Sequence, residues 1–173
     1  MSDRNAVRGS LMAFAVIAAL LLQTTVFPHL AWHGVVPDLV LLVVVGAGLV
    51  RGSQFAMVLG FAGGVLLDLA PPADHVAGRW ALALMLAGYV AGRVRQDTPA
   101  SVVTSLATVA SCSFLASSIF ALSGLVLQDP PATVPDLLQV VLAAVVWDVV
   151  LAPFVIPVVV KALGRFEPER LPA

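Results

Sequence analysis

Long uncharged apolar runs are the feature that most constrains this chain. Six such runs follow one another with short polar breaks between them, and residues 39–45 and 140–146 contain no polar side chain at all. Of the 173 residues, 60% are hydrophobic and 11% charged, whereas soluble domains are about 45–50% apolar and about 25% charged. A soluble fold of this size cannot hide so much apolar surface, so we expect the chain to fold in a lipid bilayer.

The bilayer limits the choice of secondary structure. Lipid offers no hydrogen bonds, so spanning segments must be helices or strands of a closed barrel. Barrel strands are about ten residues long and alternate between polar and apolar residues, whereas the runs here are continuously apolar. We therefore predict an all-α membrane protein.

Prolines, glycines and charged residues divide the chain into six expected transmembrane helices that form one domain. These are residues 10–27, 39–50, 55–69, 79–94, 102–127 and 136–163, with a short cytoplasmic tail at 166–173. No typical signal-peptidase site follows the first run, so we expect it to remain as the first span.

The second and third runs are short for crossing a membrane. A span takes about 20 residues, so a re-entrant pair is the alternative to two full crossings. We favour crossing, because short helices packed among longer ones are accommodated by local thinning of the bilayer.

Orientation follows from the basic residues, which gather in cytoplasmic loops. A six-span arrangement with both termini in the cytoplasm puts eight of the nine on that side and leaves Arg79 outside. The cytoplasmic set is Arg4, Arg8, Arg51, Arg93, Arg95, Lys161, Arg165 and Arg170. We expect a multi-pass protein of the plasma membrane, and the net charge of −1 gives no sign of nucleic-acid binding.

Two carboxylates stand within or beside apolar runs, where charge is costly and usually functional or paired. Asp148 lies near the middle of the sixth run. We favour a structural contact with hydroxyls of the serine- and threonine-rich fifth run, with proton or ligand coupling and a subunit contact as alternatives. Asp68 ends the third run, where it either positions a partner contact or simply ends a helix.

Glycines at four-residue spacing form two small-residue faces. Gly60 and Gly64 share one face of the third run with Asp68, and Gly88 and Gly92 form a GxxxG element on the fourth. Small residues let helices approach closely in membranes. These faces are candidates for packing within the protein or for binding a partner helix.

The sequence contains no pattern that predicts catalysis, a cofactor or a metal. The single cysteine, Cys112, excludes an internal disulfide and is expected to be a small buried residue. His29 and His33 are four apart, but Pro28 and Gly34 favour a loop there, so we interpret them as interfacial histidines.

The order of motifs resembles that of MreD, the bacterial rod shape-determining membrane protein family. The resemblance is strongest over residues 20–95, where Pro37-Asp38 and Asp68 fall in the two most specific pieces. The matching segments are 23–28 (QTTVFP), 36–41 (VPDLVL), 60–68 (GFAGGVLLD), Gly78-Arg79 with Leu82, and Gly88-Tyr89.

The resemblance implies a non-enzymatic part of the cell-elongation machinery. Members of that family bind MreC and, together with RodA, a transpeptidase of the penicillin-binding class and MreB filaments, help direct lateral peptidoglycan synthesis. Their fold is similar to that of the substrate-binding S-components of energy-coupling-factor vitamin transporters. Small-molecule capture for uptake is therefore the rival function, although the outer segments offer few aromatic residues beyond Trp32 and Trp80.

Overall fold

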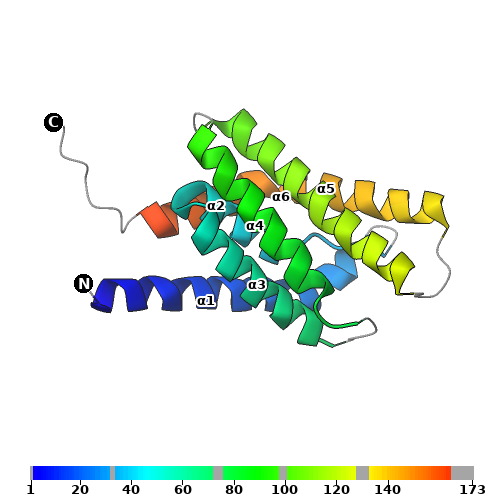
Figure 1. The fold of residues 1–173 in the computed structure, drawn as a ribbon, viewed down its shortest axis with the longest axis horizontal. Helices are drawn as coiled ribbons and strands as arrows, with labels where there is room; N and C mark the ends of the chain where they lie inside the picture. The colour runs from blue at the N-terminus through cyan, green and yellow to red at the C-terminus, as the bar shows by residue number, and fades with distance from the viewer. Residues whose placement is uncertain (1, 32–33, 72–75, 98–100, 128–132, 165–173) are drawn as a thin grey trace.

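A computed structural model of the chain describes residues 2–31, 34–71, 76–97, 101–127 and 133–164, and these are almost entirely helical (Figure 1). The helices are α1 (Ser2–Thr25), the short 3-10 helix η1 (Phe27–Leu30), α2 (Leu39–Arg51), α3 (Ser53–Leu69), α4 (Arg79–Asp97), α5 (Val102–Val126) and α6 (Val134–Gly164). The prediction of an all-α fold is confirmed for the described residues, which form six α-helices. The expected tail at 166–173 lies outside the described residues.

Three of these helices are long and apolar enough to cross a membrane. They comprise Gly9–His29, Val102–Val126 and Val134–Leu163, and α2 and α3 are apolar but shorter. Large apolar side chains point outward from the three, among them Phe14 at 70% exposure, Phe114 at 51% and Phe154 at 70%. Such surfaces suit lipid rather than water, which indicates a membrane protein.

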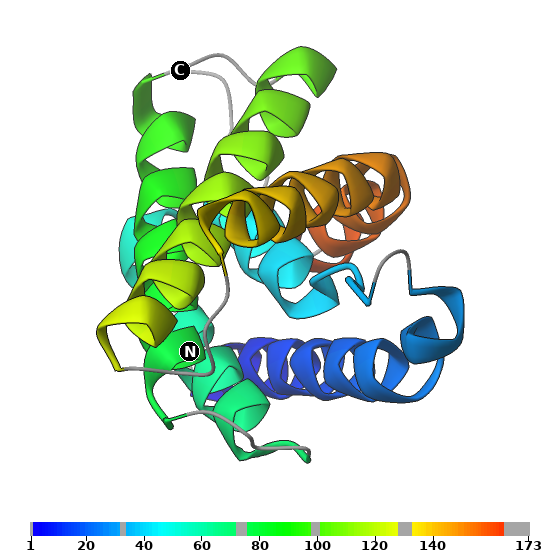
Figure 2. The same cartoon turned by 90° about the vertical axis from the view of Figure 1, so that its right-hand side faces the viewer.

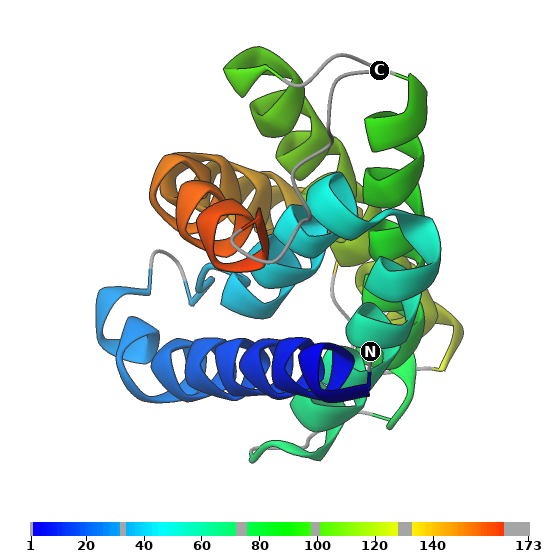
Figure 3. The same ribbon diagram turned by 90° about the vertical axis from the view of Figure 1, so that its left-hand side faces the viewer.

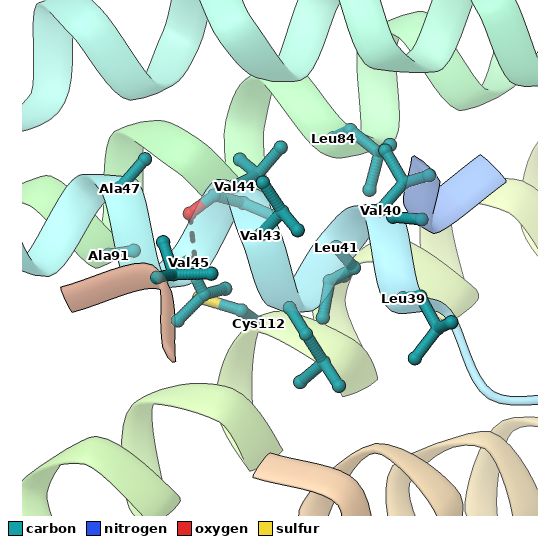
Figure 4. Close-up of a cluster of buried hydrophobic side chains, with 14 of the residues drawn as sticks. Leu39, Val40, Leu41, Val43, Val44, Val45, Ala47, Leu84, Ala91 and Cys112 are labelled. Carbon is teal, nitrogen blue, oxygen red and sulfur yellow. Dashed lines mark hydrogen bonds between the residues drawn. The ribbon is translucent and has the colours of Figure 1, made fainter. Parts of the chain in front are cut away.

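The centre of the molecule is α2. Its sequence is apolar on every side, and a helix of that kind must be surrounded by others. All ten residues from Leu39 to Gly48 are buried, and α2 runs between α1, α4 and α6 in two opposite views (Figures 2 and 3). Figure 4 shows its side chains meeting Leu84 and Ala91 of α4 and the buried Cys112 of α5, whose thiol lies 3.4 Å from the Ala87 carbonyl.

The helix α2 lies parallel to the second half of α6. Its first turn contacts Asp148, near the middle of α6, while Gly46 further along lies against Ile156 and Val159. The chain then turns into α3 through the single residue Gly52, whose φ of +86° favours glycine. The second helix therefore begins beside the midpoint of a long helix and covers only its second half.

The tightest helix contact joins α3 and α4, which run antiparallel. A Cβ placed on Gly60 would lie 2.2 Å from the Leu84 carbonyl oxygen, and one on Gly64 would lie 2.4 Å from Ala81. From the other helix, a Cβ on Gly88 would meet the carbonyl of Ala56. Likewise, a Cβ on Gly92 would meet the backbone of Ser53.

At both glycine faces, backbone atoms of the neighbouring helix therefore fill the space beside the glycines. In the structure the four glycines pack within the protein, as one of the two predicted roles required; they are Gly60, Gly64, Gly88 and Gly92. Their alternative role, as a surface for an external helix, is wrong for this fold because backbone of the neighbouring helix already fills the space.

We expect Gly60→Ala to destabilise the protein by about 1–3 kcal/mol, because the new methyl forces α3 and α4 apart. Gly9→Ala on α1 is the matched control, since a Cβ there meets nothing within 4 Å. Thermal unfolding in detergent, followed by circular dichroism, measures both. Equal melting temperatures for the two variants would show that the close α3–α4 contact does not exist.

Candidate functional site: a buried carboxylate cluster at the start of α2

The start of α2 poses a hydrogen-bonding problem. The first N–H groups of a helix have no partner within it, and here they are shut inside the protein, since Pro37, Asp38 and Leu39 are all buried. An unpaired buried donor costs about 1–3 kcal/mol. Partners for these groups must come from side chains.

Asp148 supplies the first partner. Its Oδ1 accepts the N–H of Asp38 at 2.7 Å, and its Oδ2 accepts the hydroxyl of Ser113 on α5 at 2.6 Å. The side chain is 1% exposed. The predicted contact between Asp148 and a hydroxyl of the fifth helix is therefore present, and it is joined by a contact to α2.

Two further side chains complete the cap of α2. Asp38 accepts the Leu41 N–H through Oδ1 at 2.9 Å, the usual bond of an aspartate at a helix start. Gln23 of α1 accepts the Val40 N–H at 3.3 Å. Side chains from α1, α5 and α6 thus converge on the first turn of α2.

One carboxylate oxygen of this cluster, Asp38 Oδ2, accepts no hydrogen bond from the described residues. This oxygen is buried, and the indole Nε1 of Trp147 is likewise buried with no hydrogen-bond partner among the described residues. The positive end of the α2 dipole favours negative charge at this position. Chemically, the cluster can hold charge or a proton, but its other oxygens are already engaged in supporting α2.

A second buried carboxylate, that of Asp68, caps the start of α4. Asp68, at the end of α3, accepts the N–H groups of Gly78 at 2.8 Å and of Trp80 and Ala81 at 3.1 Å each. It is 2% exposed. Neither reading made from the sequence described this role, in which Asp68 caps the next helix across the connecting segment.

Arg79 joins the same end of α4 to α5. Its Nε donates to the Ser123 hydroxyl at 2.9 Å, and its Nη2 donates to the Phe120 carbonyl at 2.6 Å. The guanidinium also lies 4.0 Å from the centre of the Phe120 ring, which stacks on Trp80. This arginine, predicted to lie on the outer side at the start of the fourth span, is 6% exposed and part of the fold.

The residues singled out from the sequence therefore form two separate groups. Pro37, Asp38 and Asp148 meet at the start of α2, while Asp68 and Arg79 lie around the start of α4. Gln23 and Ser113 were not picked out as partners of these carboxylates. The signal for Gln23 was an amide side chain directly after an apolar run, whereas nothing distinguished Ser113 from the other hydroxyl residues of the fifth helix.

Within the described residues, no three histidine, cysteine, aspartate or glutamate side chains gather closely enough to hold a metal ion. His29 is exposed in η1, and His33 lies outside the described residues.

Comparisons with known proteins add no relatives. No protein-family model, no curated protein and no solved structure matches this chain.

We expect Asp148→Leu to destabilise the protein by about 1–3 kcal/mol for each of the two donors left unpaired. Asp148→Asn should keep the fold, because its amide oxygen accepts the Asp38 N–H and its NH₂ donates to the Ser113 oxygen. Gln139→Leu, an exposed polar-to-apolar change on the same helix, is the control. Melting temperatures in detergent test this, and equal losses for Asp148→Leu and Gln139→Leu would contradict it.

We expect Asp68→Ala to loosen the first turn of α4, at about 0.5–2 kcal/mol for a lost cap. Hydrogen–deuterium exchange should speed up over residues 78–81 and stay unchanged in α6. Asp136→Ala is the matched control, because Asp136 is exposed and bonds to Thr133 at the start of α6. Unchanged exchange over 78–81 would exclude the capping role.

Proposed function

We propose that this protein is a non-enzymatic membrane scaffold of the MreD type. In this proposal it lies in a bacterial plasma membrane with six crossings and both termini in the cytoplasm. It binds MreC and, with RodA, an elongation transpeptidase of the penicillin-binding class and MreB, helps direct lateral peptidoglycan synthesis and cell shape.

The observation that carries the proposal is that the residues shared with the MreD motifs hold the helices of this fold together. Asp38 and Asp68 are the central residues of the two segments that resemble MreD most specifically, and both have carboxylate oxygens engaged in capping a helix. Arg79 is likewise held by the α5 backbone and Ser123. Motif residues engaged in building the fold support a scaffold more than a reaction centre.

The arrangement of helix ends supports the proposed orientation. The last residues of α2 and α4, the first of α5 and the second half of α6 line one groove, so they share one end of the bundle. Arg51, Arg95 and Lys161 lie on these same segments. The Asp68–Arg79 region marks the opposite end, which we assign to the outside.

The exposed apolar surface is where a partner helix has to bind in this proposal. With the glycine faces used internally, the remaining large apolar side chains lie on the outward sides of α1, α3, α5 and α6. Examples are Ile17 at 47% exposure, Leu122 at 60% and Val158 at 67%.

The test is affinity purification from the native bacterium in mild detergent, with the bound proteins identified by mass spectrometry. We expect MreC to be enriched over a tagged, unrelated membrane protein of similar size that is purified in parallel. Recovery of a pair of ATPases with a coupling membrane subunit would instead select the S-component function. Recovery of neither would also contradict the scaffold.

A further inference from the structure

A groove opens at the end of the bundle that carries the basic residues. It lies between the last turns of α2 and α4, the first turns of α5 and the second half of α6. Its volume is about 630 Å³, in the range of about 300–1,000 Å³ that small-molecule sites occupy.

One end of the groove carries basic and hydroxyl side chains. Among the described residues that line the groove, Arg95 is the charged one and is exposed, and Ser101, Thr104 and Ser105 line it as well. These residues form the first turn of α5. Ser101 caps the Thr104 N–H, while the first N–H groups of the helix have no carbonyl partner within it. A guanidinium and a helix start together favour a phosphate group.

The rest of the groove is apolar. It is lined by Leu106 of α5 and by Pro153, Ile156, Pro157 and Val160 of α6. Both helices are among the three long and apolar enough to cross a membrane, so this wall extends from the polar end into the depth of the bilayer.

We propose that this groove binds one anionic phospholipid. Its phosphate lies at Arg95 and the start of α5, and an acyl chain lies along the wall formed by Ile156 and Val160. A free phosphate would leave the apolar part empty, and an uncharged lipid would not use Arg95. Basic pockets between membrane helices on the cytoplasmic side are typical sites for anionic lipid headgroups. This inference goes beyond the scaffold function, because it requires that α5 and α6 lie in the membrane and takes from the proposed function only the cytoplasmic orientation of this end.

The experiment uses the full-length protein, purified in detergent and depleted of lipid. Phosphatidylglycerol, phosphatidylcholine with the same acyl chains, and inorganic phosphate are added separately. Native mass spectrometry gives the bound lipid, and melting temperatures give the stabilisation. We expect phosphatidylglycerol to bind at least about fivefold more tightly than phosphatidylcholine, as one basic contact near the membrane surface provides.

Arg95→Gln should remove most of this preference. Arg93→Gln is the matched control, because Arg93 is exposed on the same end of α4 but does not line the groove. Equal losses in the two variants would show that general surface charge, and not the groove, attracts the lipid. Absence of any preference in the unmodified protein would also overturn the proposal.

The apolar wall has its own pair of variants. Val160→Phe fills the groove and should weaken binding of both lipids, whereas Val158→Phe, on the same helix but outside the groove, should not. Stabilisation by inorganic phosphate alone, equal to that by phosphatidylglycerol, would show a site for free anions and overturn the lipid assignment. Recovery of MreC is measured separately, so failure of either proposal is distinguishable from failure of the other.

Discussion

The hydrogen-bonding needs of one buried helix start govern the architecture. The helix α2 is apolar on every side and begins deep within the bundle, where water does not reach its free N–H groups. Asp148, Asp38 and Gln23 supply the acceptors, and Ser113 in turn donates to Asp148. Because these side chains come from α1, α5 and α6 as well as from the start of α2 itself, satisfying one turn of helix fixes the relative positions of four helices.

The same solution recurs at the start of α4. There Asp68 accepts three backbone N–H groups, and Arg79 ties the same turn to carbonyl and hydroxyl oxygens near the end of α5. Between these two capped starts, the glycine faces of α3 and α4 bring the helix backbones into direct contact. Polar bonds therefore set the position of each helix along its neighbour, and small residues set the distance between them.

Much of this was predictable from the sequence, and the rest depended on tertiary contacts. Helix limits follow from prolines, glycines and charges, which act locally, and an intramembrane carboxylate such as Asp148 requires a polar partner wherever it lies. Its bond to the Asp38 backbone joins residues 110 positions apart, and no local pattern encodes such a distance. The glycine faces were equally ambiguous, since the spacing of Gly60 and Gly64 is the same whether they pack on the backbone of α4 or on another protein.

The distance along the chain between Asp38 and Asp148 has a consequence for biosynthesis. The ribosome makes α2 long before it makes α6, so the acceptor for the Asp38 N–H does not yet exist when the first five helices have been synthesised. The cap of α2 is therefore completed only when α6, the last helix, has been made. In a nascent or truncated chain without α6, the Asp38 N–H and the Ser113 hydroxyl therefore lack the acceptor that they have in the finished molecule.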